Sequence, residues 1–277
     1  MSTVQSIGFL SRRAAAALAF VAAVVCVAPE SFAAPVTASE VVSYEPGAAR
    51  EDYRNASAAL GPPAGDTGFG ALTPFNPPFS NEHIVIVGAG GQLTLRLSSP
   101  VASRPGPELG VFVNNGLIDV SPGGTGTAGS PAATFSPPPS ALVSVSADGQ
   151  AFVPLAGGAP VTFGNPTNAY TDTHIDNYSA PLGTQPADFA RPFTGTLSDF
   201  AGLTYEQMVT LLDGSAGGTW LDVSGTGLSS VQYVRFEVPQ GNTRMVVDAV
   251  TAVPEPAAGV LMLIALAAAS RRRVRRS

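Results

Sequence analysis

The sequence predicts a mainly β protein, an antiparallel β-sandwich or jelly roll with one short helix, flanked by a signal peptide and a C-terminal transmembrane helix. Three observations predict this class. Short apolar or alternating segments recur between turn residues, of which the 277-residue chain has 30 Gly and 25 Pro. One segment has helical spacing, and an uncharged apolar run lies near each end. The expected domains are residues 1–34, 35–252 and 253–277.

Strands of the middle domain are expected where apolar residues are continuous or alternate with polar ones. Residues 93–97 alternate between apolar and polar side chains, which predicts a strand with one buried face and one solvent-exposed face. The unbroken run 84–87 predicts a strand buried on both faces. The pair Asp148-Gly149 predicts a tight hairpin turn, because both central positions would take a positive φ. The full set of expected strands is 84–87, 93–97, 109–113, 141–146, 151–155, 231–238 and 245–250.

One helix is predicted after Thr204. Thr204 is a good N-cap, and Gln207 stands at capping-box spacing from it. An apolar stripe over residues 208–212 predicts a face packed on the core, and Gly214 is expected to cap the end. Residues 121–140 are rich in Gly, Pro, Ser and Thr, which predicts a long exposed loop rather than a domain boundary.

The N-terminal 34 residues have the pattern of a secretory signal. Two arginines precede fifteen residues, 14–28, without a charged or polar side chain. Small residues follow, so signal peptidase is expected to cut after Ala33 or Ala34. The alternative is an N-terminal anchor, but the run is short for a span of about 20 residues and is followed at once by Pro29 and Glu30.

The C-terminal 25 residues consist of three parts in a fixed order. Pro254, Glu255 and Pro256 come first, and the two prolines keep the motif extended. An uncharged apolar run follows at 257–269. By the positive-inside rule, the basic end stays cytoplasmic while the body lies outside. The arginines of that end are Arg271, Arg272, Arg273, Arg275 and Arg276.

This tail resembles the PEP-CTERM sorting signal of bacterial envelope proteins. The resemblance covers residues 253–277 and implies recognition by an exosortase, a membrane transpeptidase-like enzyme that would cut near Pro254, Glu255 and Pro256. The body would then be released or re-attached at the surface. The apolar run is rich in Ala, and the alternative is an uncleaved tail anchor.

The body resembles a module that recurs in such surface proteins, with residues 195–229 similar to planctomycete members in particular. This resemblance implies a discoidin or galactose-binding-like β-sandwich. Related sequences often carry a carboxylate in a strand that here reads Val111-Phe112-Val113-Asn114, which weakens any transferred binding role. The segments that carry the resemblance are 90–97, 107–115, 143–149 and 231–250.

Composition excludes several functions. The chain has no Lys, so neither a P-loop nor Schiff-base chemistry is available to it. Residues 34–252 carry seven Arg against eighteen acidic residues, a net charge of −11, which argues against nucleic acid as a partner. The one cysteine, Cys26, lies in the signal segment, so the mature protein would have no disulfide, thiolate metal site or Cys nucleophile.

Catalytic motifs are not found. Glycines at 88–91 follow an apolar strand as in a dinucleotide fingerprint, but residues 92–97 alternate like a strand where a helix should begin, so a turn is expected. The two histidines, His83 and His174, lie outside any HExxH motif, and no GxSxG is present. A Ser/His/Asp triad through His174 would be the hydrolase alternative.

A loop calcium site is the main cation candidate. Asp172, Asp176 and Asn177 offer two carboxylates and an amide, and hard cations prefer such oxygen ligands. The alternative is a solvated polar loop that uses Asp and Asn for turns. Asp248 is expected as an edge or structural carboxylate of the last strand. Aromatic residues that would stack on a sugar, or pack in a core instead, are Trp220, Tyr170 and Tyr178.

These features predict an exported cell-surface or extracellular-matrix protein with a non-catalytic β-sandwich in a structural or adhesive role. Signal peptidase and exosortase are the expected partners during export, and no cofactor other than calcium is expected. One alternative is a carbohydrate-binding, calcium-dependent lectin-like module that contacts a polysaccharide. The other is a secreted hydrolase, which needs a pocket with paired acids or His174.

Overall fold

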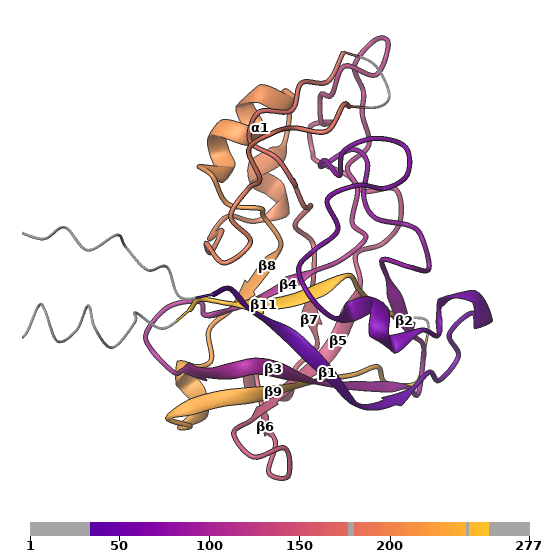
Figure 1. Cartoon of the computed structure of the whole chain (residues 1–277). Coiled ribbons are helices and arrows are strands. Elements are labelled where there is room, and N and C mark those ends of the chain that lie inside the picture. Colours follow the sequence, from indigo (N-terminus) through magenta and orange to yellow (C-terminus); the bar gives the residue numbers. More distant parts are fainter. Residues whose placement is uncertain (1–33, 177–179, 242–243, 255–277) are drawn as a thin grey trace, which may run out of the picture. The chain divides into compact units, whose positions relative to one another are not determined.

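The computed structural model describes residues 34–176, 180–241 and 244–254. In these ranges the protein is mainly β, with antiparallel sheets and one α-helix, as the sequence predicts (Figure 1). The strands are β1 Val36–Glu45, β2 Val85–Val87, β3 Gln92–Ala102, β4 Leu109–Phe112, β5 Ser140–Ser146, β6 Val153–Pro154, β7 Val161–Thr162, β8 Thr219–Leu221, β9 Ser230–Glu237, β10 Met245–Val247 and β11 Ala249–Ala252. The helix is α1 Tyr205–Leu212, and the short 3-10 helices are η1 Glu51–Tyr53, η2 Ala56–Ala59, η3 Ala156–Gly158, η4 Leu197–Phe200 and η5 Ser224–Thr226.

Strand β1 joins two halves of one large sheet. The strand order is β6-β5-β9-β3-β1-β11-β4-β8, with β7 paired to β5. The first residues of β1 pair with β11, through Val36 opposite Ala252, and the rest of the strand pairs with β3. We call β3, β5, β6 and β9 the outer half, and β4, β8 and β11 the inner half. A separate small sheet pairs β2 with β10.

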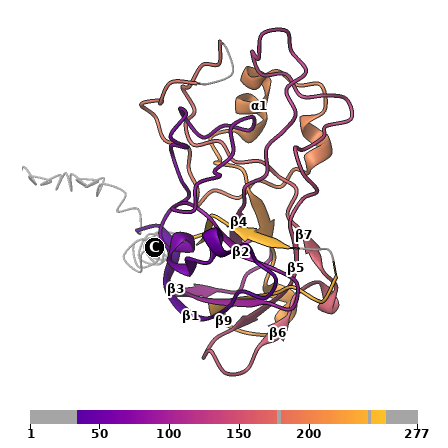
Figure 2. The same cartoon turned by 90° about the vertical axis from the view of Figure 1, so that its right-hand side faces the viewer.

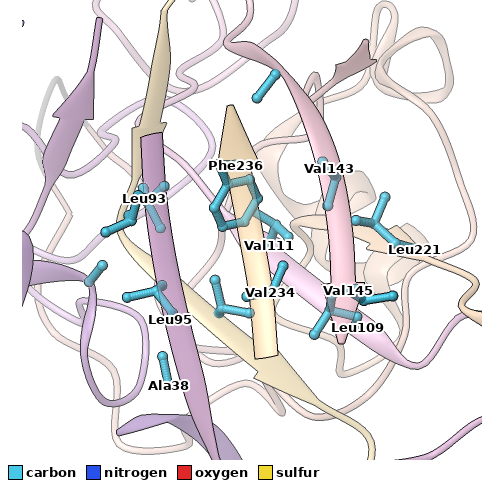
Figure 3. Packing of buried hydrophobic residues seen from close by; sticks show 14 of the residues in the cluster. Ala38, Leu93, Leu95, Leu109, Val111, Val143, Val145, Leu221, Val234 and Phe236 are labelled. Carbon is cyan, nitrogen blue, oxygen red and sulfur yellow. The ribbon is translucent and has the colours of Figure 1, made fainter. Parts of the chain in front are cut away.

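One hydrophobic core takes side chains from both halves. Figure 3 shows Val234 and Phe236 of β9 close to Val111 of β4, with leucines and valines of neighbouring strands around them. Phe236 is fully buried, and its ring lies 6.1 Å from that of Phe163 in an edge-on arrangement. Burial of apolar area on this scale is the main stabilising contribution to the fold.

The opposite face of the inner half is covered by loops and the helix. We call residues 64–82, 114–138, 164–176 and 180–218 the loop layer, and Figures 1 and 2 show it on the side of β4 and β8 that carries α1. Phe112 of β4 and Ala249 of β11 pack there against Ala187 and Ala216. Two further apolar clusters, around Phe200 and Tyr205, hold the layer together.

The structure differs from the sequence prediction at several strands. Three strands were not predicted: β1, β7 and β8. The expected strand 245–250 is interrupted at Asp248, because Val247 pairs with Val85 in the small sheet whereas Ala249 pairs with Phe112 in the large one. The expected strand 151–155 shortens to Val153–Pro154.

The predicted helix and turns are found with small changes. Thr204 and Gln207 form the expected capping box at the start of α1. The helix ends at Leu212, and its C-cap is Asp213, which takes the left-handed conformation at φ 48°. The cap is therefore one residue earlier than the predicted Gly214. A turn at 88–91 leads into β3, which leaves no helix there. The hairpin at Asp148 has a longer loop than a two-residue turn, since its strands resume only at Val153.

The loop predicted at 121–140 is only partly exposed. Asp119, just before it, accepts hydrogen bonds from the backbone N–H groups of Ser121, Gly126 and Thr127. Ala128 is buried, and its N–H donates to the carbonyl of Leu203 at 3.0 Å. The segment is therefore an ordered part of the loop layer.

Candidate functional site

The one tryptophan lies at the junction of the inner half and the loop layer. Trp220 of β8 stands opposite Gly110 of β4. A Cβ atom at position 110 would lie 2.8 Å from Cζ2 of the indole, so only glycine lets the ring lie against the strand. The indole Nε1–H donates to the carbonyl of Gly217 at 2.9 Å. The half-buried ring is thus fixed in place before any ligand arrives.

Trp220 forms one wall of a cavity of about 590 Å³, which we call the Trp220 groove. This volume is in the usual range for small-molecule sites, roughly 300–1,000 Å³. None of the residues that line the groove has a titratable side chain. The wall includes two aromatic rings and several hydroxyl and amide groups, from Trp220, Phe193, Asn165, Thr194, Thr196 and Thr219.

Hydrogen bonds and ring contacts hold the groove in shape. The Asn165 side chain donates to the carbonyls of Gly195 at 2.9 Å and Gly218 at 3.2 Å, which ties two sides together. The Phe193 ring lies 5.5 Å from Phe200 in the loop-layer cluster. A pre-formed wall lowers the conformational entropy that the protein must lose when a ligand binds.

Thr219 presents a polar atom with an unmet hydrogen bond. Its Oγ1 is buried and has no hydrogen-bond partner among the described residues. Buried hydroxyls in proteins are nearly always bonded, and an unbonded one costs on the order of 1–3 kcal/mol. Thr219 is also one of the residues that line the Trp220 groove.

The predicted calcium ligands lie in a loop whose main carboxylate is already hydrogen-bonded. Asp172 accepts from the N–H and Oγ1–H of Thr184, at 3.0 Å and 2.6 Å, and from the N–H of Gln185 at 3.0 Å. These bonds hold the pKa of Asp172 below its ordinary value. Asp176 lies four residues further on, and Asn177 is outside the described residues.

The parts of the chain that the structure covers hold no group of three or more His, Cys, Asp or Glu side chains placed to bind a metal ion. The hydrogen bonds that Asp172 accepts from Thr184 and Gln185 are of the kind that stabilises turns. The calcium site stays a prediction, since one of its three ligands is not described.

His83, His174 and Tyr170 do not line the Trp220 groove. His174 is exposed, and its Nδ1 lies 3.6 Å from Oε1 of Glu206 on α1. Tyr170 packs in the Tyr205 cluster of the loop layer, and Tyr178 is outside the described residues. Of the three aromatic candidates for a sugar site, the groove contains Trp220.

Asp248 is buried rather than on an edge. It is 2% exposed between β10 and β11, and both carboxyl oxygens lie 3.3 Å from the N–H of Ala64. Burial raises the pKa of Asp248 to about 7, although the hydrogen bond from Ala64 lowers it in part. Of the two predicted roles, edge or structural carboxylate, the burial of Asp248 at the strand break agrees with the structural one.

The predicted processing residues flank the first and last strands. Ala34 is exposed two residues before β1, and Pro254 is partly exposed two residues after β11. Ala33, Glu255, Pro256 and the five C-terminal arginines lie outside the described residues. Within the described ranges, no helix combines the length and apolar character needed to cross a membrane.

No protein-family model matches the chain, and no curated protein matches its sequence.

Proposed function

We propose that the chain is an exported, exosortase-sorted cell-surface or extracellular-matrix protein. Its body would be a non-catalytic, discoidin-like or galactose-binding-like β-sandwich in a structural or adhesive role. Two halves of a sheet that share one core support the sandwich. The tripartite end at 253–277 and the signal-like segment at 1–34 support export and sorting.

The position of the first and last strands carries this proposal. Val36 of β1 pairs with Ala252 of β11, so both ends of the folded part leave the sheet at adjacent points. Cleavage after Ala34 and near Pro254 would remove no residue of either strand. A body that keeps its sheet after both cuts is what processing at two ends requires.

Mass spectrometry of the protein made in a host with an exosortase tests the sorting. We expect mature chains that begin near Pro35 and lack the basic tail. A Glu255→Gln variant should retain the tail, whereas the control Glu206→Gln, at an exposed helix position, should be processed normally. Recovery of the intact chain, tail included, from the surface would contradict the proposal.

A second candidate function, carbohydrate binding, is favoured by the Trp220 groove. An indole face suits the apolar face of a sugar ring, and the groove's hydroxyl and amide groups suit the sugar's hydroxyls. Thr219, whose buried Oγ1 has no hydrogen-bond partner among the described residues, belongs to the same lining. Since the lining has no titratable group, general acid–base hydrolysis lacks its residues there. The groove therefore favours binding over a hydrolase.

Fluorescence titration offers a direct test, because the chain has one Trp. A glycan array selects the sugar, and its binding should then shift the Trp220 emission. Thr219→Val should weaken binding about fivefold or more, while the control Thr125→Val, at an exposed loop position, should not. Titrations with calcium and with a chelator test the calcium-dependent form. A blank array together with an unchanged emission would remove this candidate.

A further inference from the structure

A second cavity, of about 480 Å³, lies on the side of β2 that faces the segment after β1. We call it the Arg50–Arg244 pocket. Its walls are largely apolar, with Ile84 and Ile86 from the β2 region and Phe79 from the loop layer. Ile84 is 2% exposed, so its side chain is held by the packing around it. Arg50, Arg244 and Asn114 complete the lining.

The walls of this pocket are held by the backbone. A Cβ atom at Gly88 would lie 2.3 Å from the backbone N of Ala49, so glycine at this position lets the chain cross closely. The N–H of Ala48 donates to the carbonyl of Ala89 at 3.0 Å across the same crossing. On the other wall, the Tyr53 hydroxyl donates to the carbonyl of Phe79 at 2.9 Å.

The charges of the pocket are opposite to those of the body. Residues 34–252 have a net charge of −11, yet no carboxylate is in the lining. Among the described residues, Arg244 has no ion pair and donates one hydrogen bond, at 3.3 Å, to Ser136 Oγ. By contrast, Arg96 is paired with Glu40 at 3.2 Å. A guanidinium carries five N–H donors, so Arg244 has capacity for an anion.

Arg50 has a weak internal partner. Its Nη2 lies 3.6 Å from Oδ2 of Asp52, and both side chains are more than 70% exposed. Its guanidinium also lies 5.5 Å from the Tyr53 ring centre. An exposed ion pair at this distance contributes at most about 1 kcal/mol. A ligand anion can therefore displace Asp52 at small cost.

We propose that the Arg50–Arg244 pocket binds a small organic acid, with its carboxylate on the two guanidinium groups and its apolar body against Ile84 and Ile86. Guanidinium groups hold carboxylates through paired, charge-assisted hydrogen bonds. The apolar wall selects a ligand with a hydrophobic body over an inorganic anion. The proposal is independent of the sugar candidate, because the two cavities share no lining residue.

Calorimetry with 3-phenylpropionate and its neutral amide tests the proposal on the protein that carries residues 35–254. The acid should bind, and the amide should bind at least tenfold more weakly, since it lacks the charge. Arg50→Gln and Arg244→Gln should each weaken binding of the acid roughly tenfold. The matched control is Arg104→Gln, at an exposed position outside the pocket.

Asp52→Asn provides a variant that gains affinity. Removing the competing carboxylate should tighten binding of the acid about two- to fivefold, a result that misfolding cannot produce. Equal binding of acid and amide, or loss of binding in Arg104→Gln as large as in the two pocket variants, would overturn the proposal. Inorganic phosphate that binds as tightly as 3-phenylpropionate would also overturn it, because the apolar wall would then have no role.

Discussion

The two halves of the large sheet differ in what covers them. In the outer half, β3 and β9 mix buried residues with residues that are partly or fully exposed, whereas β5 is mostly buried. In the inner half, all residues of β4 and β11 are buried, since the shared core covers one face and the loop layer the other. An antiparallel sheet can be stable with one face buried and the other in water. The second face of the inner half is therefore buried by other parts of the chain, which here form the loop layer.

The two covers are built differently. The shared core is one continuous apolar cluster that takes side chains from most strands. The loop layer has three smaller clusters, and its turns are held by carboxylates that accept backbone N–H groups, such as Asp119, Asp172 and Asp199. Regions with fewer buried apolar contacts open at lower free energy. We therefore expect the loop layer to open before the sheet does.

The largest expected difference is between two fully buried phenylalanines. Phe236→Ala should cost about 3–5 kcal/mol of unfolding free energy by leaving a cavity in the shared core. Phe200→Ala creates a comparable cavity in the loop layer. Denaturant unfolding with hydrogen exchange distinguishes the two. Phe236→Ala should lower protection in every strand, and Phe200→Ala mainly in α1 and the loops. Equal loss everywhere would show one cooperative unit.

The next effect is a pH dependence at Asp248, where the loop layer meets the strand break. Burial raises the pKa of Asp248 to about 7 from the ordinary value of 3.8. The folded state therefore holds this proton up to higher pH than the unfolded state does. The stability that this group contributes is fully present below pH 3.8 and is lost as the pH rises through 7.

Between pH 5 and 7 the loss should be about 2–3 kcal/mol, since one pKa unit corresponds to roughly 1.4 kcal/mol. Asp248→Asn cannot titrate, so thermal unfolding of the variant should lack this part of the slope. Glu82→Gln, with an exposed side chain in a turn, is the control. Parallel pH curves for wild type and Asp248→Asn would show that the carboxyl is ionised in the folded protein.

A smaller effect is expected at Asp119, which holds the glycine-rich turn of the loop layer. Burial raises its pKa, but bonds from Ser121, Gly126 and Thr127 outweigh it and hold the pKa below its usual value. Asp119→Ala should cost about 1–2 kcal/mol of unfolding free energy. Thermal melts at pH 7 measure this. A loss below 0.5 kcal/mol, on the order of a neutral surface change, would show that the turn forms without the carboxylate.

The smallest effect is expected at the N-cap of α1. Thr204→Ala removes the hydroxyl that accepts from the N–H of Gln207 and should cost about 1 kcal/mol. Thr210→Ala, at an exposed position within the same helix, should be neutral or slightly stabilising because Ala is the better helix former. Denaturant midpoints of the two variants give the comparison, and a Thr210→Ala loss equal to that of Thr204→Ala would argue against a capping role.

Local sequence patterns predict those strands, and the one helix, whose periodicity and caps lie within a single short segment. The alternation at 93–97 and 231–238 and the capping box at Thr204 correspond directly to β3, β9 and α1. Strand β1 escaped prediction because most of its residues after Ala38 are half-buried or exposed. Its place between β3 and β11 depends on pairing with residues at least 47 positions away, from Glu45 opposite Gln92 to Val36 opposite Ala252.

The same limit applies to the candidate sites. Trp220 could be named from the sequence as a residue that stacks on a sugar, but its role depends on Gly110 opposite it and on Phe193 across the groove. The arginines of the second pocket lie 194 positions apart, and no local pattern connects them. The sequence leaves Asp248 as an edge or structural carboxylate, because it does not show that the strand changes partners at this residue.

By itself, the sequence determined the class of fold, the position of many of its regular elements and the residue types it lacks, because periodicity, caps and composition act over a few residues. Only the tertiary structure decided which strand joins the two halves, which strands are buried on both faces and which side chains line the same cavity. Those outcomes depend on contacts between distant segments, whose free energies are set by mutual burial and pairing rather than by local preference.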